Sequence, residues 1–116
     1  MAEHPVLDFI RGKLPAQAGP FALLAEFEAM PGRGDAVAAA ITASRVVPLT
    51  RAEAGCTAYD LGRDADRPDR FVAHECWADL AALEAHLATA HFAAVGAALQ
   101  GLLAGAPTIR VLTTQA

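Results

Sequence analysis

The chain has 116 residues, of which 54% are hydrophobic and 19% are charged, so it forms one domain with a modest core and surplus apolar surface. Nine basic and thirteen acidic side chains give a net charge of −4, without the basic stripe that a nucleic-acid-binding surface needs. No apolar run approaches the roughly 20 residues of a membrane span, and the first residues lack a secretory signal pattern, so we expect a cytoplasmic protein with no membrane partner.

The beginning of the chain is rich in turn formers, namely Pro5, Gly12, Pro15, Gly19 and Pro20. This composition predicts that residues 1–20 are an N-terminal arm or extension with at most one helical turn. Whether the arm lies over a neighbouring subunit stays open. The folded domain is expected over residues 21–116.

The first predicted strand covers residues 21–29, FALLAEFEA, and alternates with a period of two. A helix is then expected over about residues 36–51, with Asp35 as its N-cap. Pro48 falls inside this helix, where a proline costs about 3 kcal/mol. We therefore expect a kink, or a break followed by a short last turn through Glu53, with Gly55 as the C-cap.

Two further strands are predicted over residues 56–62 and 70–77, and the polar loop between them favours an antiparallel hairpin. Thr57, Tyr59 and Leu61 should share one face of the first of these strands. Helices over about residues 79–86 and 89–103 follow, with Asp79 as an N-cap candidate, and a last strand covers residues 108–113. The order β-α-β-β-α-β predicts an α+β, ferredoxin-like protomer, in which helices cover one face of an antiparallel sheet.

The other face of this sheet would be bare, and it carries Ala22, Leu24 and Val72. Burying these apolar side chains against an identical sheet would form a symmetric homodimer and account for the surplus apolar surface. His74, which points to the same face, is most simply an interface residue.

Glu75 and Trp77 lie two residues apart on a strand and therefore share a face. Glu75 with a raised pKa could act as a base, or it could order a neighbouring histidine. Alternatively, Glu75 makes a structural hydrogen bond and Trp77 fills the edge of the core. Tyr59 could donate its hydroxyl to a substrate oxygen, although buried tyrosines on strands more often only pack.

His86 and His91 are five residues apart, which turns them about 140° away from each other in a continuous helix. They are not the i, i+4 pair of a zinc protease, so we expect no metal site, although a kink near Thr89 could bring them together. Either histidine could instead act alone in a cavity. Cys56 and Cys76 are expected to be reduced thiols, and no residue has the sequence signature of an activated nucleophile.

The order and spacing of several short segments resemble the antibiotic biosynthesis monooxygenase domain family, which includes quinol monooxygenases. The segments are Ala54-Gly55-Cys56 with Tyr59, Arg70-Phe71, Glu75-Cys76-Trp77, Ala82-Leu83-Glu84-Ala85-His86, Thr89, and His91-Phe92. The likeness covers about residues 21–112.

The resemblance implies a dimeric α+β barrel and a hydrophobic cavity between sheet and helices, in which a phenolic or quinol substrate is oxidised by O2 without flavin, haem or metal. Carried over to this sequence, it places His86 as the general base, polarised by Glu75 if the two meet. Trp77, Tyr59, His91 and Phe92 would contact a small hydrophobic aromatic substrate.

Other readings stay open, because relatives in this family differ in function. A haem-binding or haem-degrading protein would need His86 or His91 as an axial ligand. A small-molecule isomerase and a non-catalytic dimeric domain that binds a hydrophobic ligand are further alternatives.

Overall fold

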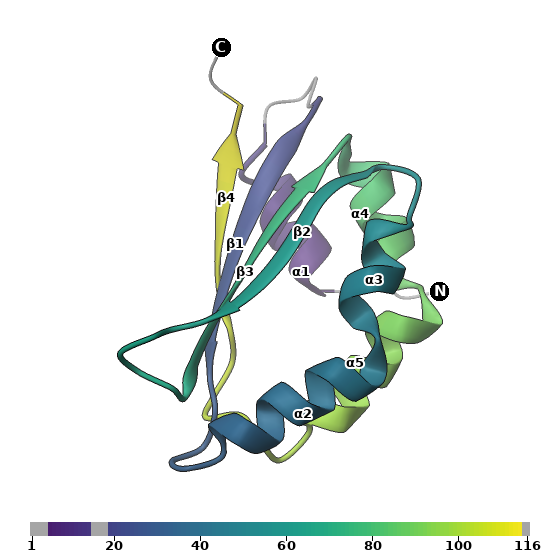
Figure 1. Cartoon of the computed structure of the whole chain (residues 1–116). Coiled ribbons are helices and arrows are strands. Elements are labelled where there is room, and N and C mark those ends of the chain that lie inside the picture. The colour runs from purple at the N-terminus through teal and green to yellow at the C-terminus, as the bar shows by residue number, and fades with distance from the viewer. Residues whose placement is uncertain (1–4, 15–18, 115–116) are drawn as a thin grey trace.

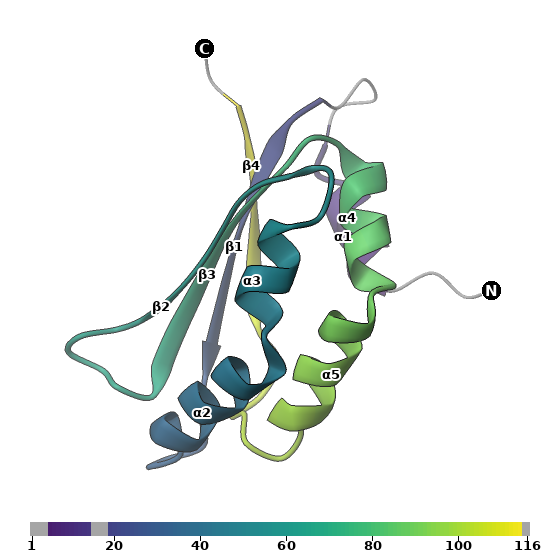
Figure 2. The same cartoon turned by 45° about the vertical axis from the view of Figure 1, so that its right-hand side comes forward.

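The framework of the protein is a four-stranded antiparallel sheet with the strand order β2-β3-β1-β4. A computed structural model describes residues 5–14 and 19–114. The strands are β1 (Phe21–Glu28), β2 (Cys56–Arg63), β3 (Arg70–Trp77) and β4 (Thr108–Thr113). The helices lie on one side of the sheet (Figure 1), and a second view shows the same layering (Figure 2). The predicted α+β, ferredoxin-like fold is therefore confirmed.

The helical layer contains five segments among the described residues. They are α1 (Pro5–Arg11), α2 (Gly34–Ser44), α3 (Val46–Arg51), α4 (Leu80–Leu87) and α5 (Ala90–Leu99). Within residues 5–14 and 19–114, no single helix is long and apolar enough to cross a membrane; α4 and α5 reach that length and apolarity only together, bent by 60°.

The strand register confirms the predicted alternation of faces. Phe21 lies opposite Trp77, and Leu23 lies opposite Glu75, so the inward faces of β1 and β3 coincide. Tyr59 of β2 is also opposite Glu75. A bulge between Cys56 and Ala58 changes the register at the start of β2. Thr57 is therefore exposed and does not share the face of Tyr59, contrary to expectation.

The expected helix over residues 36–51 is broken, and the break lies at Arg45, before Pro48. A proline has no N–H to bond the carbonyl four residues earlier, and its ring clashes with that group, here on Ser44. The chain leaves the helix directly after Ser44, where Arg45 adopts a left-handed conformation with φ of 60°. Pro48 then stands in the first turn of α3, where it is tolerated.

The start of α2 also differs from the prediction, because the helix begins at Gly34 and Asp35 is not its N-cap. The backbone N–H groups of Gly32 and Gly34 instead donate to the two carboxylate oxygens of Asp69, at 3.0 and 2.9 Å. Asp35 pairs with Arg63 at 2.9 Å. The cap therefore comes from the distant β2–β3 loop, which a local pattern does not reveal.

The N-terminal segment contributes to the core, which the sequence did not predict. Helix α1 has seven residues, nearly two turns, and its Leu7 and Ile10 are 2% and 1% exposed. Both pack in a cluster with Phe21, Trp77 and Leu83, among others. The expectation of at most one helical turn was wrong. Residues 1–4 and 15–18 of the predicted arm lie outside the described residues.

Candidate functional site

A cavity of about 550 Å³ lies between the sheet and the helices. This volume is within the range of small-molecule binding sites. Most of the side chains that line the cavity are apolar, and Val6 and Ile10 of α1 are among them. The polar side chains along its wall are Tyr59, Glu75, His86 and Gln100.

His86 is the most deeply buried polar side chain at this cavity, with 1% exposure. It occupies the last turn of α4, which begins after the N-cap Asp79, as predicted; the Asp79 carboxylate accepts from Ala82 N at 2.8 Å. Two aromatic rings flank the imidazole, with centroids 4.8 Å away in Trp77 and 5.2 Å away in Phe92. The imidazole is thus held in an apolar setting, where its polar contacts are strong.

A bend between α4 and α5 brings His91 to the same place as His86. The two helices meet at 60°, and the imidazole centroids are 5.9 Å apart. Thr89 stabilises the joint, because its hydroxyl donates to His86 O at 2.7 Å and accepts from Phe92 N at 3.2 Å. The kink near Thr89 that the sequence left as a possibility is present.

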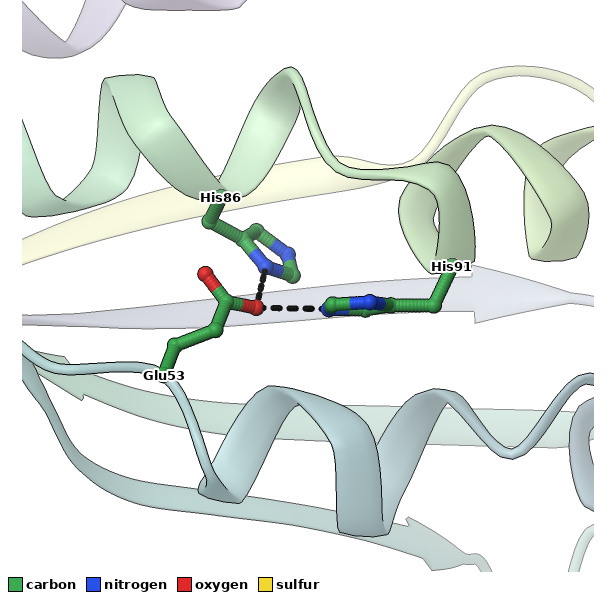
Figure 3. A group of neighbouring side chains, drawn as sticks. All are labelled: Glu53, His86 and His91. Atoms are coloured by element: carbon green, nitrogen blue, oxygen red, sulfur yellow. Dashed lines mark hydrogen bonds and ion pairs between the residues drawn. The ribbon is translucent and has the colours of Figure 1, made fainter.

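Glu53 joins the two histidines through a single carboxylate oxygen. Its Oε2 atom lies 2.7 Å from His86 Nδ1 and 2.7 Å from His91 Nε2 (Figure 3). An ionised carboxylate can only accept hydrogen bonds, so both of these nitrogens carry a hydrogen. In a neutral His86 this leaves Nε2 with a free lone pair, which is the form of a histidine that can take up a proton.

Two contacts of the neighbouring residues hold Glu53 close to α4. The Arg51 guanidinium donates to Tyr59 O and to Asp60, both at 2.8 Å, and thereby fixes the end of α3 against β2. Gly55 then passes so close to Ala82 of α4 that any Cβ at position 55 would collide with it. The expected C-cap role of Gly55 is wrong, since Ala52 caps α3; the glycine permits close packing instead.

Glu75 faces the cavity, but its hydrogen-bond partner is Trp77 and not His86. The Trp77 indole N–H donates to Glu75 Oε1 at 3.0 Å. Burial raises the pKa of the Glu75 carboxyl, and the hydrogen bond from Trp77 only partly opposes this shift. A carboxyl with a raised pKa in a cavity is typical of groups that donate or accept protons in catalysis.

Tyr59 lies across the strand pair from Glu75 and is 7% exposed. Burial raises the pKa of its phenol, so the hydroxyl keeps its proton and remains a donor. Burial also raises the pKa of Cys56, and Cys56 and Cys76 are both free thiols. A raised pKa disfavours the thiolate, which is the nucleophilic form.

The structure therefore groups most of the predicted site residues around one cavity. His86, Glu75, Tyr59 and Phe92 line it. Trp77 is fully buried behind Glu75, and His91 reaches the site through Glu53, so neither is among the lining residues. Sequence reasoning missed Glu53, although this residue directly precedes the Ala54-Gly55-Cys56 segment that carried the resemblance.

Comparisons with known proteins identify chains of similar sequence and fold. A family model described as antibiotic biosynthesis monooxygenase matches residues 20–98. A crystal structure of a Pseudomonas aeruginosa protein is 35% identical, with a TM-score of 0.77, covering 88% of this chain and 100% of that one. A Mycobacterium tuberculosis protein is 31% identical, with a TM-score of 0.74, covering 84% of this chain and 96% of that one.

A further crystal structure, described as an antibiotic biosynthesis monooxygenase, is 30% identical with a TM-score of 0.74. The alignment covers 83% of this chain and 99% of that one. A search of curated proteins found no match.

Proposed function

Because this chain belongs to the antibiotic biosynthesis monooxygenase family, we propose that it oxidises a small aromatic quinol or anthrone-like compound with O2, without a cofactor. Such a substrate becomes electron-rich enough to reduce oxygen once it has lost a proton. The protein then has three tasks, which are to remove that proton, to stabilise the resulting anion and to keep water away.

The observation that carries this proposal is the position of His86. Its imidazole lies at an apolar cavity of about 550 Å³, and its Nδ1–H is held by Glu53 at 2.7 Å. A carboxylate that fixes the tautomer and orientation of a histidine is the arrangement that prepares the other ring nitrogen to act as a general base.

The proposed reaction balances without any further reductant. For an anthrone-like substrate, His86 Nε2 takes a proton from the ring CH2 group, and the resulting carbanion adds to O2. The hydroperoxide formed in this way loses water to give a carbonyl group. One oxygen atom remains in the product, the other leaves as water, and the substrate supplies all the electrons.

Two neighbouring groups would support the anionic states of this reaction. The Tyr59 hydroxyl, which keeps its proton, can donate to the oxygen that carries the negative charge of the substrate. The raised pKa of Glu75 favours its protonated form, which can also donate, while the Trp77 hydrogen bond fixes its position. Phe92 provides part of the aromatic wall against which a flat substrate can pack.

The alternative of a haem-binding protein receives less support from the cavity wall. Among the described residues that line the cavity, there is no lysine or arginine to pair with haem propionates. His86 Nδ1 and His91 Nε2 are already engaged in hydrogen bonds with Glu53.

We also propose that the active form is a homodimer joined through the open sheet face. In the part of the chain that the structure describes, no helix covers this face (Figure 1). Leu112 on it is 42% exposed, and Leu24 lies nearby on the neighbouring strand. Packing against a second copy would bury these apolar side chains.

The test is O2 consumption by the purified protein with a panel of anthrones and hydroquinones, in buffer free of metal and flavin. We expect saturable uptake that falls at least about tenfold in His86→Ala, the lower range for loss of a general base. Glu84→Ala, which removes an exposed side chain of the same helix α4, is the matched control and should retain activity. Uptake that stays at the uncatalysed rate with every compound would overturn the proposal and favour a non-catalytic ligand-binding protein.

A further inference from the structure

Glu53, His86 and His91 bring three potential metal ligands together from three separate segments. Their ligand atoms all lie within 4.8 Å of one another. Glu53 belongs to the segment between α3 and β2, His86 to α4 and His91 to α5, so only the tertiary structure creates the group. Figure 3 shows both imidazoles turned toward the same carboxylate oxygen.

The chemistry of this donor set suits a divalent transition metal. Two imidazole nitrogens and one carboxylate oxygen form the three-ligand set that binds Zn²⁺ and leaves a fourth position open. Related sets bind other first-row ions, whereas Mg²⁺ and Ca²⁺ prefer oxygen ligands throughout.

Small movements of the side chains are enough to admit such an ion. Each nitrogen now lies 2.7 Å from the carboxylate oxygen, and the ligand atoms of a tetrahedral zinc site are about 3.3 Å apart. The Glu53 and His91 side chains are 15% and 14% exposed, which gives solvent a path to the group, whereas His86 is 1% exposed and fixed.

We propose that Glu53, His86 Nδ1 and His91 Nε2 form a binding site for a divalent transition-metal ion of the Zn²⁺ type. The ion replaces the two hydrogens that now bridge the imidazoles to the carboxylate. Each imidazole stays neutral when its hydrogen moves to its other ring nitrogen. A His86 that binds metal through Nδ1 therefore carries its hydrogen on Nε2, and this nitrogen can no longer accept a proton. If the proposed monooxygenase function holds, the bound metal inhibits the enzyme. Only this inhibition, and not the metal binding, rests on that function.

Zinc titration of the full chain against a chromophoric chelator tests the binding directly. The titration is done in a Cys76→Ser background, because Cys76 Sγ lies 3.8 Å from His74 Nε2 and offers a competing soft ligand. We expect one zinc per chain, and binding at least tenfold weaker after His91→Ala or Glu53→Ala. The matched controls His74→Ala and Glu84→Ala should bind zinc like the parent.

Cobalt provides a second readout, since Co²⁺ bound by these ligands gives visible absorption that reports its coordination. This absorption should be present in the parent and absent in the His91→Ala variant, which removes the more exposed histidine and so spares the core. Absence of stoichiometric zinc binding in the parent overturns the proposal, as does equal binding by the parent and the His91→Ala and Glu53→Ala variants.

Oxygen uptake separates the metal site from the proposed activity. Zinc should inhibit the Cys76→Ser parent and leave its His91→Ala variant, which keeps His86 and Glu53, at least tenfold less sensitive. Zinc binding without any oxygen uptake would reject the monooxygenase function alone, and uptake that stays unchanged in a zinc-loaded protein would reject the inhibition by the bound metal.

Discussion

Glu53 and His86 are 33 residues apart in the sequence, and their side chains are joined by a hydrogen bond of 2.7 Å. In the proposed reaction, which starts with removal of a proton, this bond gives Glu53 the part of a positioning residue for His86. The first prediction concerns the consequence of weakening it.

Glu53→Gln should lower kcat about 10- to 100-fold and leave KM for the substrate nearly unchanged. The amide keeps the size of the side chain, but it has no charge to stabilise the protonated histidine. Steady-state oxygen uptake measures both constants, and Glu84→Gln on the exposed face of α4 is the matched control. A rise in KM at unchanged kcat would show that Glu53 contributes to substrate binding instead.

Glu75→Gln should make the protein more stable than the wild type at high pH. Because the pKa of Glu75 is raised in the folded state, folding takes up a proton between the ordinary glutamate pKa and the raised value. The stability of the wild type therefore falls as the pH rises through this window, and a glutamine, which can still accept from Trp77, removes this loss.

Urea unfolding from about pH 4 to pH 8 measures the effect, since this range starts near the ordinary pKa of a glutamate. The two proteins should have similar stability at the lowest pH and diverge as the pH rises. Glu84→Gln should differ from the wild type by the same small amount at every pH. If the free energy of unfolding of Glu75→Gln and of the wild type followed parallel curves against pH, the assigned upward shift of the Glu75 pKa would be contradicted.

Leu7→Ala should destabilise the protein by about 2 to 5 kcal/mol, the usual cost of a large-to-small change in a core. Leu7 is 2% exposed and packs in the same cluster as Trp77. Phe9→Ala, at a position of the same helix that is 48% exposed, should change the free energy of unfolding by about 0.5 kcal/mol or less. Equal effects of the two substitutions in urea unfolding would mean that α1 does not belong to the core.

Leu24→Asp should convert the proposed homodimer into monomers. Leu24 lies on the open sheet face between His74 and Arg110, whose side chains can accommodate a carboxylate in a single subunit. Burying that carboxylate between two sheets would be costly. Sedimentation equilibrium measures the change, and Leu49→Asp at a 40% exposed position of α3 should have no effect. A wild-type monomer would reject the dimer.

The sequence was informative wherever structure depends on local periodicity. The alternation from Phe21 to Phe27 predicted the inward face of β1, and the N-cap candidate Asp79 marked where α4 begins. The site was harder to predict, because Glu53 meets partners that are 33 and 38 residues away. Residue spacing alone set His86 and His91 on different sides of a helix, and only the bend joins them.

The cap of α2 was missed, and the expected break of the helix lies at Arg45 and not at Pro48. Asp69 reaches the start of α2 from 35 and 37 residues away, so no nearby residue signals it. The break was expected at Pro48 itself, but the proline acts on the carbonyl of the preceding turn and displaces the break toward Ser44.

Under the proposed function, the contribution of α1 to the cavity separates the choice of substrate from catalysis. The family model matches residues 20–98, so Val6 and Ile10 form part of the cavity wall from outside the shared segment. His86 and its carboxylate partner lie inside it. A relative that matches only this segment is thus free to differ in the wall that α1 forms. Replacing this short segment would change the size and shape of the accepted compounds while the proposed chemistry stayed the same.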